Sequence, residues 1–280
     1  MNNVVACIDG SPSALGVCDA AAWASTRLDA PLTLLHVLEK SSTPDQDNLS
    51  GAIGLGSREH LLSELTELDE KRSRLALEHG KHMLADAKDR VQKQGVVKVE
   101  EVQRHGFVLD TILEMQHATR LLVMGRMGED HTQGQVALGS HLENVVRAAS
   151  NPILVSVGEF NAPRNYMLAY DGSETANKAI ERVAASPLLR GLEGHLVMVG
   201  EAESDRLEPA KLLLEQHGHS VTSCVLKGDI ADALHQYQEA HRIEMLVMGA
   251  YGHSRIRQFF VGSNTSKMVT ESTVPIILLR

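Results

Sequence analysis

The residues best suited to hold a ligand lie near the end of the chain, where Met248 and Gly249 follow a short apolar run. Gly252 comes next, and after nine further residues Gly262 and Ser263 precede a segment with helix-like composition. Glycine lets backbone N–H groups come close to a ligand, and the first turn of a helix adds unpaired N–H donors and the positive end of the helix dipole. A serine hydroxyl at that point caps the helix or donates to a phosphate oxygen. The spacing therefore predicts a phosphate-binding loop between a strand and a helix.

Length and composition restrict the class of protein. With 280 residues, of which 43% are hydrophobic, the chain can form one large domain or two of about 140 residues. The net charge of −9 argues against a nucleic-acid or anionic-membrane partner. No apolar run approaches the roughly 18–20 residues that span a bilayer, and no basic region precedes the first apolar run as in a signal peptide. The three cysteines, Cys7, Cys18 and Cys224, lie in apolar segments and are expected to be buried free thiols, which favours a cytoplasmic protein.

Three segments recur in the same order along the chain. The offsets are 162, 124 and 123 residues, and the pairs are Asp9-Gly10-Ser11 with Asp171-Gly172-Ser173, 121–125 with 245–249, and 151–155 with 274–278. Ordered matches over so long a period indicate tandem domains rather than a solenoid. We predict a first domain over residues 1–158 and a second over residues 159–280, with the boundary in the Gly-, Asn- and Pro-containing segment 158–164.

Each half alternates strand-like and helix-like segments. In the first half we expect strands at 4–8, 32–38, 96–103, 121–125 and 153–157, and helices at 14–28, 59–94, 109–117 and 142–149. This order predicts an α/β fold of two tandem, doubly wound, Rossmann-like parallel-sheet domains. Ligands of such sheets bind beyond the carboxyl ends of the strands, at the point where the strand order reverses. Asp9, Gly125, Asp171 and Gly249 all fall at strand ends of this kind.

The halves differ by an insertion in the first, at about residues 38–95. It contains a polar, Gly-rich segment, 41–57, and a long charged segment with helical composition. We favour a surface insertion whose amphipathic helix covers the sheet, and a lid over the ligand is the alternative.

These residues resemble the universal stress protein family in its tandem two-domain form, over nearly the whole chain. Nucleotide-binding members of that family carry G-x2-G-x9-G-[ST] after the fourth strand, and Gly249, Gly252, Gly262 and Ser263 match this motif in full. The resemblance implies two halves related by a pseudo-twofold axis, which pair as single-domain members pair in dimers.

The first half departs from the motif. It has Gly125, Gly128, Gly139 and Ser140, but ten residues separate Gly128 from Gly139 and the loop begins with two acidic residues. A carboxylate beside a polyphosphate is repulsive unless a cation bridges them. The second loop instead carries His253, Ser254, Arg255 and Arg257, which suit anions. We therefore expect binding mainly in the second half and leave binding in the first half open.

The resemblance also implies roles for individual residues. At the nucleoside end, Asp171 would reach the ribose or adenine edge, the Val199 main chain would contact adenine and Met248 would touch the base; their counterparts are Asp9, Val37 and Met124. At the phosphate end, Gly249 and Gly252 would let the loop pass close to the phosphates, and His253, Gly262, Ser263 and Asn264 would lie around them. Each role has a plain alternative, namely an Asx-turn for the aspartates, core packing for Val and Met, and an ordinary capped turn for the glycines.

The resulting hypothesis is a cytoplasmic stress-response regulator that binds ATP, ADP or AMP, with Mg²⁺ as a candidate companion and at most weak ATP hydrolysis. We expect no nucleic-acid or membrane partner, and we expect the chain to form a homodimer. The alternatives are a scaffold that binds no nucleotide, and an enzyme such as a nucleotidyltransferase, for which no catalytic constellation can be identified. Two histidine pairs, His79 with His82 and His217 with His219, lack further ligands at zinc spacing and are expected at the surface.

Overall fold

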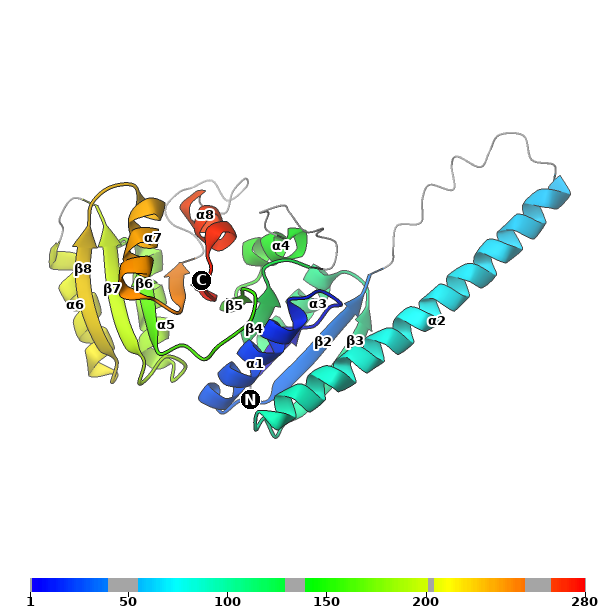
Figure 1. Cartoon of the computed structure of the whole chain (residues 1–280), viewed down its shortest axis with the longest axis horizontal. Coiled ribbons are helices and arrows are strands. Elements are labelled where there is room, and N and C mark those ends of the chain that lie inside the picture. The colour runs from blue at the N-terminus through cyan, green and yellow to red at the C-terminus, as the bar shows by residue number, and fades with distance from the viewer. Residues whose placement is uncertain (1, 40–54, 129–138, 201–203, 250–262, 280) are drawn as a thin grey trace.

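The computed structural model describes residues 2–39, 55–128, 139–200, 204–249 and 263–279. Ten strands form one sheet in the order β3-β2-β1-β4-β5-β10-β9-β6-β7-β8, so the two halves share a continuous sheet (Figure 1). The strands of the first half are β1 (Asn3–Cys7), β2 (Leu32–Leu38), β3 (Val99–His105), β4 (Thr119–Gly125) and β5 (Ile153–Ser156). Those of the second are β6 (Asn165–Ala169), β7 (Glu193–Val199), β8 (Ser220–Leu226), β9 (Leu246–Gly249) and β10 (Ile276–Leu279).

Strands within each half run parallel, and the halves meet through one antiparallel pair. Ile276 of β10 lies opposite Val155 of β5, and Leu278 lies opposite Ile153. In the first half, β1 pairs with β2 on one side and with β4 on the other. In the second half, β6 likewise pairs with β7 on one side and with β9 on the other. The expected α/β, doubly wound fold is confirmed, and the arrangement gives each half one reversal point, β1/β4 and β6/β9.

Helices cover both faces of the sheet. The first half contributes α1 (Ala14–Leu28), α2 (Leu55–Lys93), α3 (Val108–Met115), the short 3-10 helix η2 (Gln116–Ala118) and α4 (Ser140–Ala148). The second contributes α5 (Glu174–Ala185), α6 (Ser204–Gln216), α7 (Ile230–His241) and α8 (Ser263–Glu271). Two core clusters follow, because successive strand residues point to opposite faces: Val4 and Ala6 join the cluster under α1, whereas Val5 joins the cluster under α4. No helix in these described ranges is long and apolar enough to cross a membrane.

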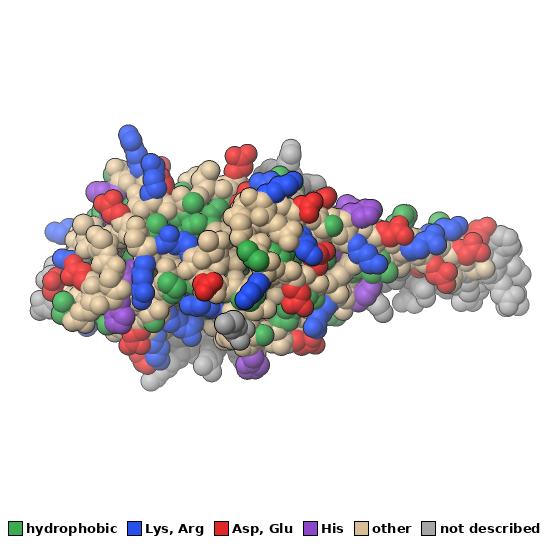
Figure 2. All heavy atoms as spheres, turned by 90° about the horizontal axis from the view of Figure 1, so that it is seen from below, with side chains coloured by type: hydrophobic (Ala, Val, Ile, Leu, Met, Phe, Trp, Pro, Cys, Tyr) green, Lys and Arg blue, Asp and Glu red, His purple; other side chains and the backbone are tan. Residues whose placement is uncertain are grey.

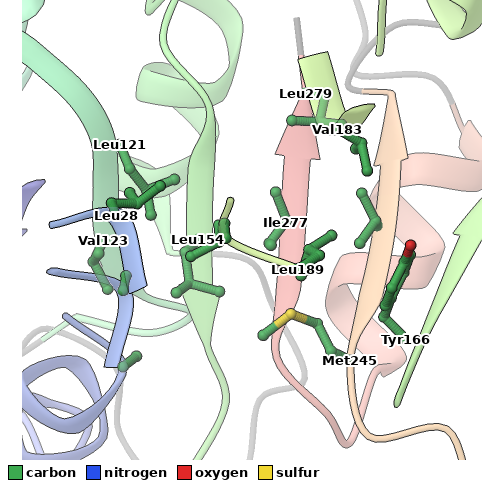
Figure 3. Close-up of a cluster of buried hydrophobic side chains, with 14 of the residues drawn as sticks. Leu28, Leu121, Val123, Leu154, Tyr166, Val183, Leu189, Met245, Ile277 and Leu279 are labelled. Carbon is green, nitrogen blue, oxygen red and sulfur yellow. The ribbon is translucent and has the colours of Figure 1, made fainter. Parts of the chain in front are cut away.

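The first of these clusters runs without interruption from one half to the other. Leu154 of β5 and Ile277 of β10 are buried on neighbouring strands, with Leu121 on one side and Met245 and Tyr166 on the other (Figure 3). An apolar cavity also lies here, lined by residues that include Leu28, Leu121, Val183, Leu189 and Ile277. It is remote from the carboxyl ends of β1 and β6, so it is not the predicted ligand site.

Helix α2 differs from expectation. Leu84, Ala87 and Val91 near its end are buried, whereas residues 63–75 are exposed, and Figure 1 shows the first part of the helix extending away from the sheet. The prediction that this helix covers the sheet therefore holds only for its C-terminal part. The alternative of a lid concerns segment 41–57, nearly all of which lies outside the described residues.

The end of α2 explains why β3 starts three residues later than expected. Gly95 adopts a φ of +94°, and the Val96 N–H donates to the Val91 carbonyl at 3.2 Å. This is the pattern of a helix C-cap in which a glycine takes the left-handed conformation. Val96 is buried as part of that cap, so its apolar character does not mark the start of the strand.

Candidate functional site

Two groups of predicted residues lie at the two reversal points. In the first half, Asp9 follows β1 closely and Gly125 ends the neighbouring β4, with Ala6 opposite Val123 in the pairing of these strands. In the second half, Asp171 follows β6 and Gly249 ends β9, with Leu168 opposite Val247. We call these groups the first and second strand-end sites. Each pairs an acidic residue with a glycine at the edge where ligands of such sheets bind.

The first strand-end site is closely packed. The Asp9 carboxylate accepts hydrogen bonds from the Ser11 N–H at 3.1 Å and the Ser11 hydroxyl at 2.5 Å, which is an Asx-turn. A side chain at Gly125 would begin 2.8 Å from the Ser13 Cβ, so only glycine fits there. At Gly128 an added Cβ would lie 3.5 Å from an Asp9 oxygen, an ordinary contact that places the carboxylate beside the loop.

The glycine that opens α4 in this half already has a partner for its N–H group. The Gly139 N–H donates to the Arg126 carbonyl at 3.1 Å, and Ser140 begins the helix. An N–H bonded within the chain is not offered to a phosphate, so this half presents fewer donors than its motif suggests.

In the second strand-end site, Asp171 also forms an Asx-turn. Its carboxylate accepts from the Ser173 N–H at 3.0 Å, and the Ser173 hydroxyl caps α5 by accepting from the Ala176 N–H at 3.0 Å. The turn chemistry considered as the plain alternative is therefore present. It is compatible with ligand binding, because the bond to Ser173 uses one of the two carboxylate oxygens.

The structure adds a cationic residue to this site that the sequence did not indicate. Gly172 has a φ of +70°, and an added Cβ would lie 2.9 Å from the Arg206 Cδ. Burial raises the pKa of the neighbouring Tyr170, the Asp171 charge raises it further, and Arg206 acts in the opposite direction. Arg206 therefore lies against the Asp171-Gly172 turn, although it comes from α6 and has no motif around it that would have identified it.

The other predicted nucleoside contacts occupy core positions. Met124 and Met248 are buried, and Val37 and Val199, at the ends of β2 and β7, are half-buried against the same core cluster. Core packing therefore accounts for these four side chains. The expectation for the valines concerned their main chain, and it remains a prediction.

The remaining predicted residues belong to the second loop. Gly252, His253 and Gly262 lie outside the described residues. Ser263 and Asn264 begin α8, where the backbone alone is described. Of the motif, the structure thus places Gly249 at the end of β9 and Ser263 at the start of the helix.

The residues of the two predicted histidine pairs differ in their exposure to water. His79, His82 and His217 are exposed as expected, but His219 is buried, and its Nδ1 lies 3.4 Å from the Tyr166 hydroxyl. The prediction of a surface position was wrong for His219, because the strand that starts at Ser220 turns this residue toward the sheet. Among the described residues, no group of three or more His, Cys, Asp or Glu side chains is placed to hold a metal ion.

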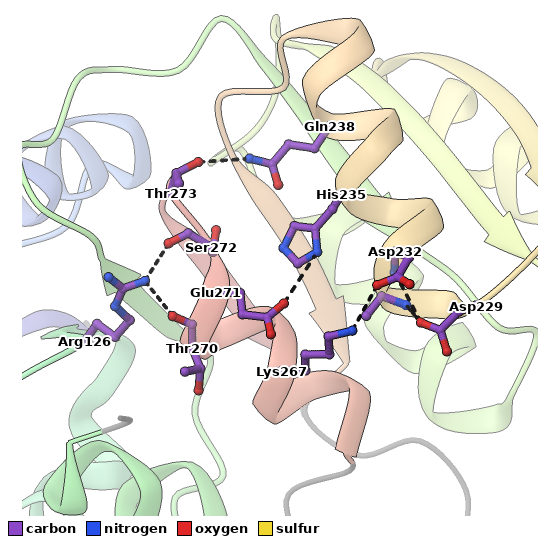
Figure 4. Close-up of polar contacts among 11 residues, drawn as sticks. Arg126, Asp229, Asp232, His235, Gln238, Lys267, Thr270, Glu271, Ser272 and Thr273 are labelled. Carbon is purple, nitrogen blue, oxygen red and sulfur yellow. Dashed lines mark hydrogen bonds and ion pairs between the residues drawn. The ribbon is translucent and has the colours of Figure 1, made fainter. Parts of the chain in front are cut away.

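An arginine of the first half holds the helix that begins at the second loop. The Arg126 Nη1 donates to the carbonyl oxygens of Thr270 at 3.0 Å and Ser272 at 2.5 Å, at the C-terminal end of α8 (Figure 4). A cation suits the negative end of a helix dipole. Burial lowers the pKa of the Arg126 guanidinium, as expected for a cation partly removed from water. The matching position in the second half is Ala250, so the sequence provides this arginine on one side only.

Contacts with α7 fix the other side of α8. Lys267 pairs with Asp232 at 3.0 Å, His235 lies 3.9 Å from Glu271, and Gln238 donates to the Thr273 hydroxyl at 3.4 Å (Figure 4). Asp229 caps α7 itself, accepting from the N–H groups of Ala231 and Asp232. The helix that starts the phosphate side of the motif is thus held between its own half and Arg126.

Fold and site together define a doubly wound α/β protein with two related halves, each with an Asp and a Gly at its reversal point. The sequence profile of the universal stress protein family matches residues 1–156 and 192–280. The chain is 33% identical to universal stress protein Slr1230 of Synechocystis over the full length of both, and 22% identical to a universal stress protein of Mycolicibacterium smegmatis over 93% of this chain and 92% of that one. A solved universal stress protein from Archaeoglobus fulgidus superposes with a TM-score of 0.71 at 18% identity, covering 100% of this chain and 98% of the other. The chain belongs to the universal stress protein family.

Proposed function

We propose that this protein is a cytoplasmic stress-response regulator that binds an adenine nucleotide, ATP, ADP or AMP, mainly at the second strand-end site. The observation that carries the proposal is the complete G-x2-G-x9-G-S sequence, which starts at the end of β9 and finishes at the first residue of α8. A loop of this kind leads backbone N–H groups and a helix N-terminus toward an anion.

The residues at the second strand-end site and the sequence of the second loop support an anionic ligand. Arg206 lies against the Asp171-Gly172 turn, and the loop sequence itself contains Arg255 and Arg257. Asp171 would serve the nucleoside end, where a carboxylate accepts hydrogen bonds from ribose hydroxyls. The phosphates would lie toward Ser263 and Asn264, at the positive end of α8.

The first strand-end site is less suited to the same ligand. The Gly139 N–H is bonded to Arg126, the Asp9 carboxylate lies beside Gly128, and the loop sequence begins with Glu129 and Asp130. These negative charges would repel a polyphosphate that carries no bridging cation. The proposal therefore assigns the main site to the second half.

Three further features belong to the same proposal. Mg²⁺ would accompany ATP by bridging its phosphates rather than by occupying a cage of protein side chains. Hydrolysis would be weak at most, because the sequence shows no catalytic constellation of side chains that would activate a water molecule. The domain division at residues 1–158 and 159–280 and a homodimeric state complete the proposal.

Isothermal titration of the full chain with ATP and Mg²⁺ tests this proposal. Wild type should bind, and Gly262→Val should lose binding with an unchanged circular dichroism spectrum, because the added side chain fills the phosphate space. Gly128→Ala is a control in the loop of the other half, where the added Cβ makes only an ordinary contact, and it should bind as wild type does. Absence of binding by wild type would favour the scaffold function, and rapid turnover with an acceptor substrate would favour a nucleotidyltransferase.

A further inference from the structure

The long helix α2 carries two apolar stripes on different sides. In its C-terminal part, Leu84, Ala87 and Val91 face the sheet, with exposed fractions of 2%, 6% and 0%. In the part that leaves the sheet, Leu65, Leu68 and Leu75 are 39%, 61% and 64% exposed. The protein therefore presents leucines to water on a segment that its own core does not require.

The exposed leucines do not continue the stripe that faces the sheet. Leu75 and Leu84 are nine residues apart, which is about two and a half helical turns, so they point to opposite sides of the helix. Along the sheet-facing stripe, Gly80 is buried and Leu77 half-buried before Leu84, and the next positions toward the N-terminus, Ser73 and Glu70, are polar and exposed. The apolar side of α2 thus changes where the helix leaves the domain, as it would if a different surface covered it there.

The spacing of the exposed leucines is that of a coiled coil. Leu65 and Leu68 take positions a and d of one heptad, and Arg72 and Leu75 take a and d of the next. The aliphatic stem of an arginine packs at such a position while its charged end reaches water. A single helix in water is marginally stable, so a segment standing off the domain gains stability from a partner helix. Figure 2 shows acidic and basic side chains mixed along the same projecting segment, which gives it partners for charge pairing.

We propose that this leucine stripe (Leu65, Leu68 and Leu75) contacts the α2 helix of a second copy of the chain, the two helices running antiparallel with Leu65 and Leu68 at the centre of the contact. The inference rests on the homodimer of the proposed function and identifies the surface that forms it. An antiparallel pair brings Leu65 of each copy against Leu68 of the other, so the contact is self-complementary, as a twofold dimer requires.

Charge decides the orientation. Glu64 and Lys71 occupy equivalent flanking positions, and an antiparallel pair sets Glu64 of each copy beside Lys71 of the other. A parallel pair would instead set Glu64 beside Asp69 of the second copy, which is repulsive. Lys71 is free to reorient, because its pair with Glu67 within the helix is 4.0 Å long and both side chains are mostly exposed.

Sedimentation of the full chain over a range of concentrations tests the surface. Wild type should show a concentration-dependent dimer, and Leu65→Glu with Leu68→Glu should sediment as a monomer. Ser63→Glu with Ser73→Glu is the matched control. It adds the same charge at exposed positions outside the leucine stripe and should leave the dimer intact. A wild type that stays monomeric, or a dimer that survives the leucine substitutions, would overturn the proposal.

Disulfide trapping tests the orientation. Leu65→Cys and Leu68→Cys should cross-link when the two variants are mixed, and neither should cross-link efficiently alone. The wild-type protein, treated in the same way, shows how much cross-linking the native cysteines give. Cross-linking of each variant alone would overturn the antiparallel arrangement. Nucleotide titration of the Leu65→Glu, Leu68→Glu variant separates this proposal from the previous one, because it should bind ATP as wild type does while failing to dimerise.

Discussion

Replacing Arg126 with methionine tests the contact between the halves. Methionine keeps an apolar chain of similar length, so the packing of the arginine stem is largely preserved. The change removes the two hydrogen bonds from Nη1 to the carbonyl oxygens of Thr270 and Ser272. It also removes a cation from the C-terminal end of α8.

The magnitude follows from these contacts. A hydrogen bond from a charged donor contributes roughly 1.5–3 kcal/mol, and two would give about 3–6 kcal/mol if they were independent. Part of that gain is offset because the guanidinium is partly removed from water, which is also why its pKa is lowered. We expect Arg126→Met to lower the free energy of unfolding by about 2–3 kcal/mol, which corresponds to a fall in Tm of roughly 3–5 °C for a chain of 280 residues.

Urea unfolding followed by two signals provides the assay. The fluorescence of Trp23, the single tryptophan, reports α1 of the first half, where the centroid of its ring lies 5.6 Å from that of Phe160 at the start of the second half. Far-ultraviolet circular dichroism reports the whole chain. Both signals should shift together. Arg120→Met is the control, because Arg120 is exposed and, within the described part of the chain, donates one hydrogen bond, to the Leu28 carbonyl of its own half at 3.1 Å. This substitution should cost less than about 1 kcal/mol. An Arg126→Met protein as stable as Arg120→Met would refute the reasoning.

Three further predictions concern other parts of the molecule. Gly16→Ala should destabilise by about 1–3 kcal/mol in thermal unfolding, because the new Cβ would lie 2.1 Å from the Gly158 carbonyl oxygen; an unchanged Tm would contradict this. Burial, followed by the Arg190 charge, lowers the pKa of His219, so the folded protein favours the neutral ring. The unfolded chain, with a His219 pKa of about 6.5, therefore binds more protons than the folded protein between the two pKa values. Wild-type stability should therefore fall as pH drops through 6.5 toward the lower folded pKa, and His219→Gln should lose less between pH 7.5 and 5.5; equal losses would argue against this role. Asp171→Asn keeps the oxygen that accepts the turn hydrogen bond and should weaken ATP binding about tenfold by titration, whereas Asp9→Asn should not.

The fold was predictable because its signals are local and repeated. Helix 14–28 and strand 32–38 have the bounds expected from composition, since each has apolar positions at a regular spacing and turn residues at its ends. The recurrence of Asp-Gly-Ser and of the glycine-ended strand predicts that Asp9 lies with Gly125 and Asp171 with Gly249. Parallel-sheet geometry then brings each pair to one edge.

What could not be predicted depends on distant contacts. Arg126 meets Thr270 across 144 positions in the sequence, and only the antiparallel pairing of β5 with β10 brings them together. Arg206 reaches the second strand-end site from a helix that carries no motif. His219 is polar in a polar segment, so its burial cannot be inferred from its neighbours. The direction of α2 was missed because a long amphipathic pattern does not show where the helix leaves its sheet.

A crystal structure of the full chain grown with ATP and Mg²⁺ tests the nucleotide assignment most directly. We predict an adenine nucleotide beyond the carboxyl ends of β6 and β9, its ribose near Asp171 and its phosphates at the start of α8. The assignment would be contradicted by a structure in which that position stays without nucleotide at saturating ATP, or in which the nucleotide occupies the β1/β4 edge alone.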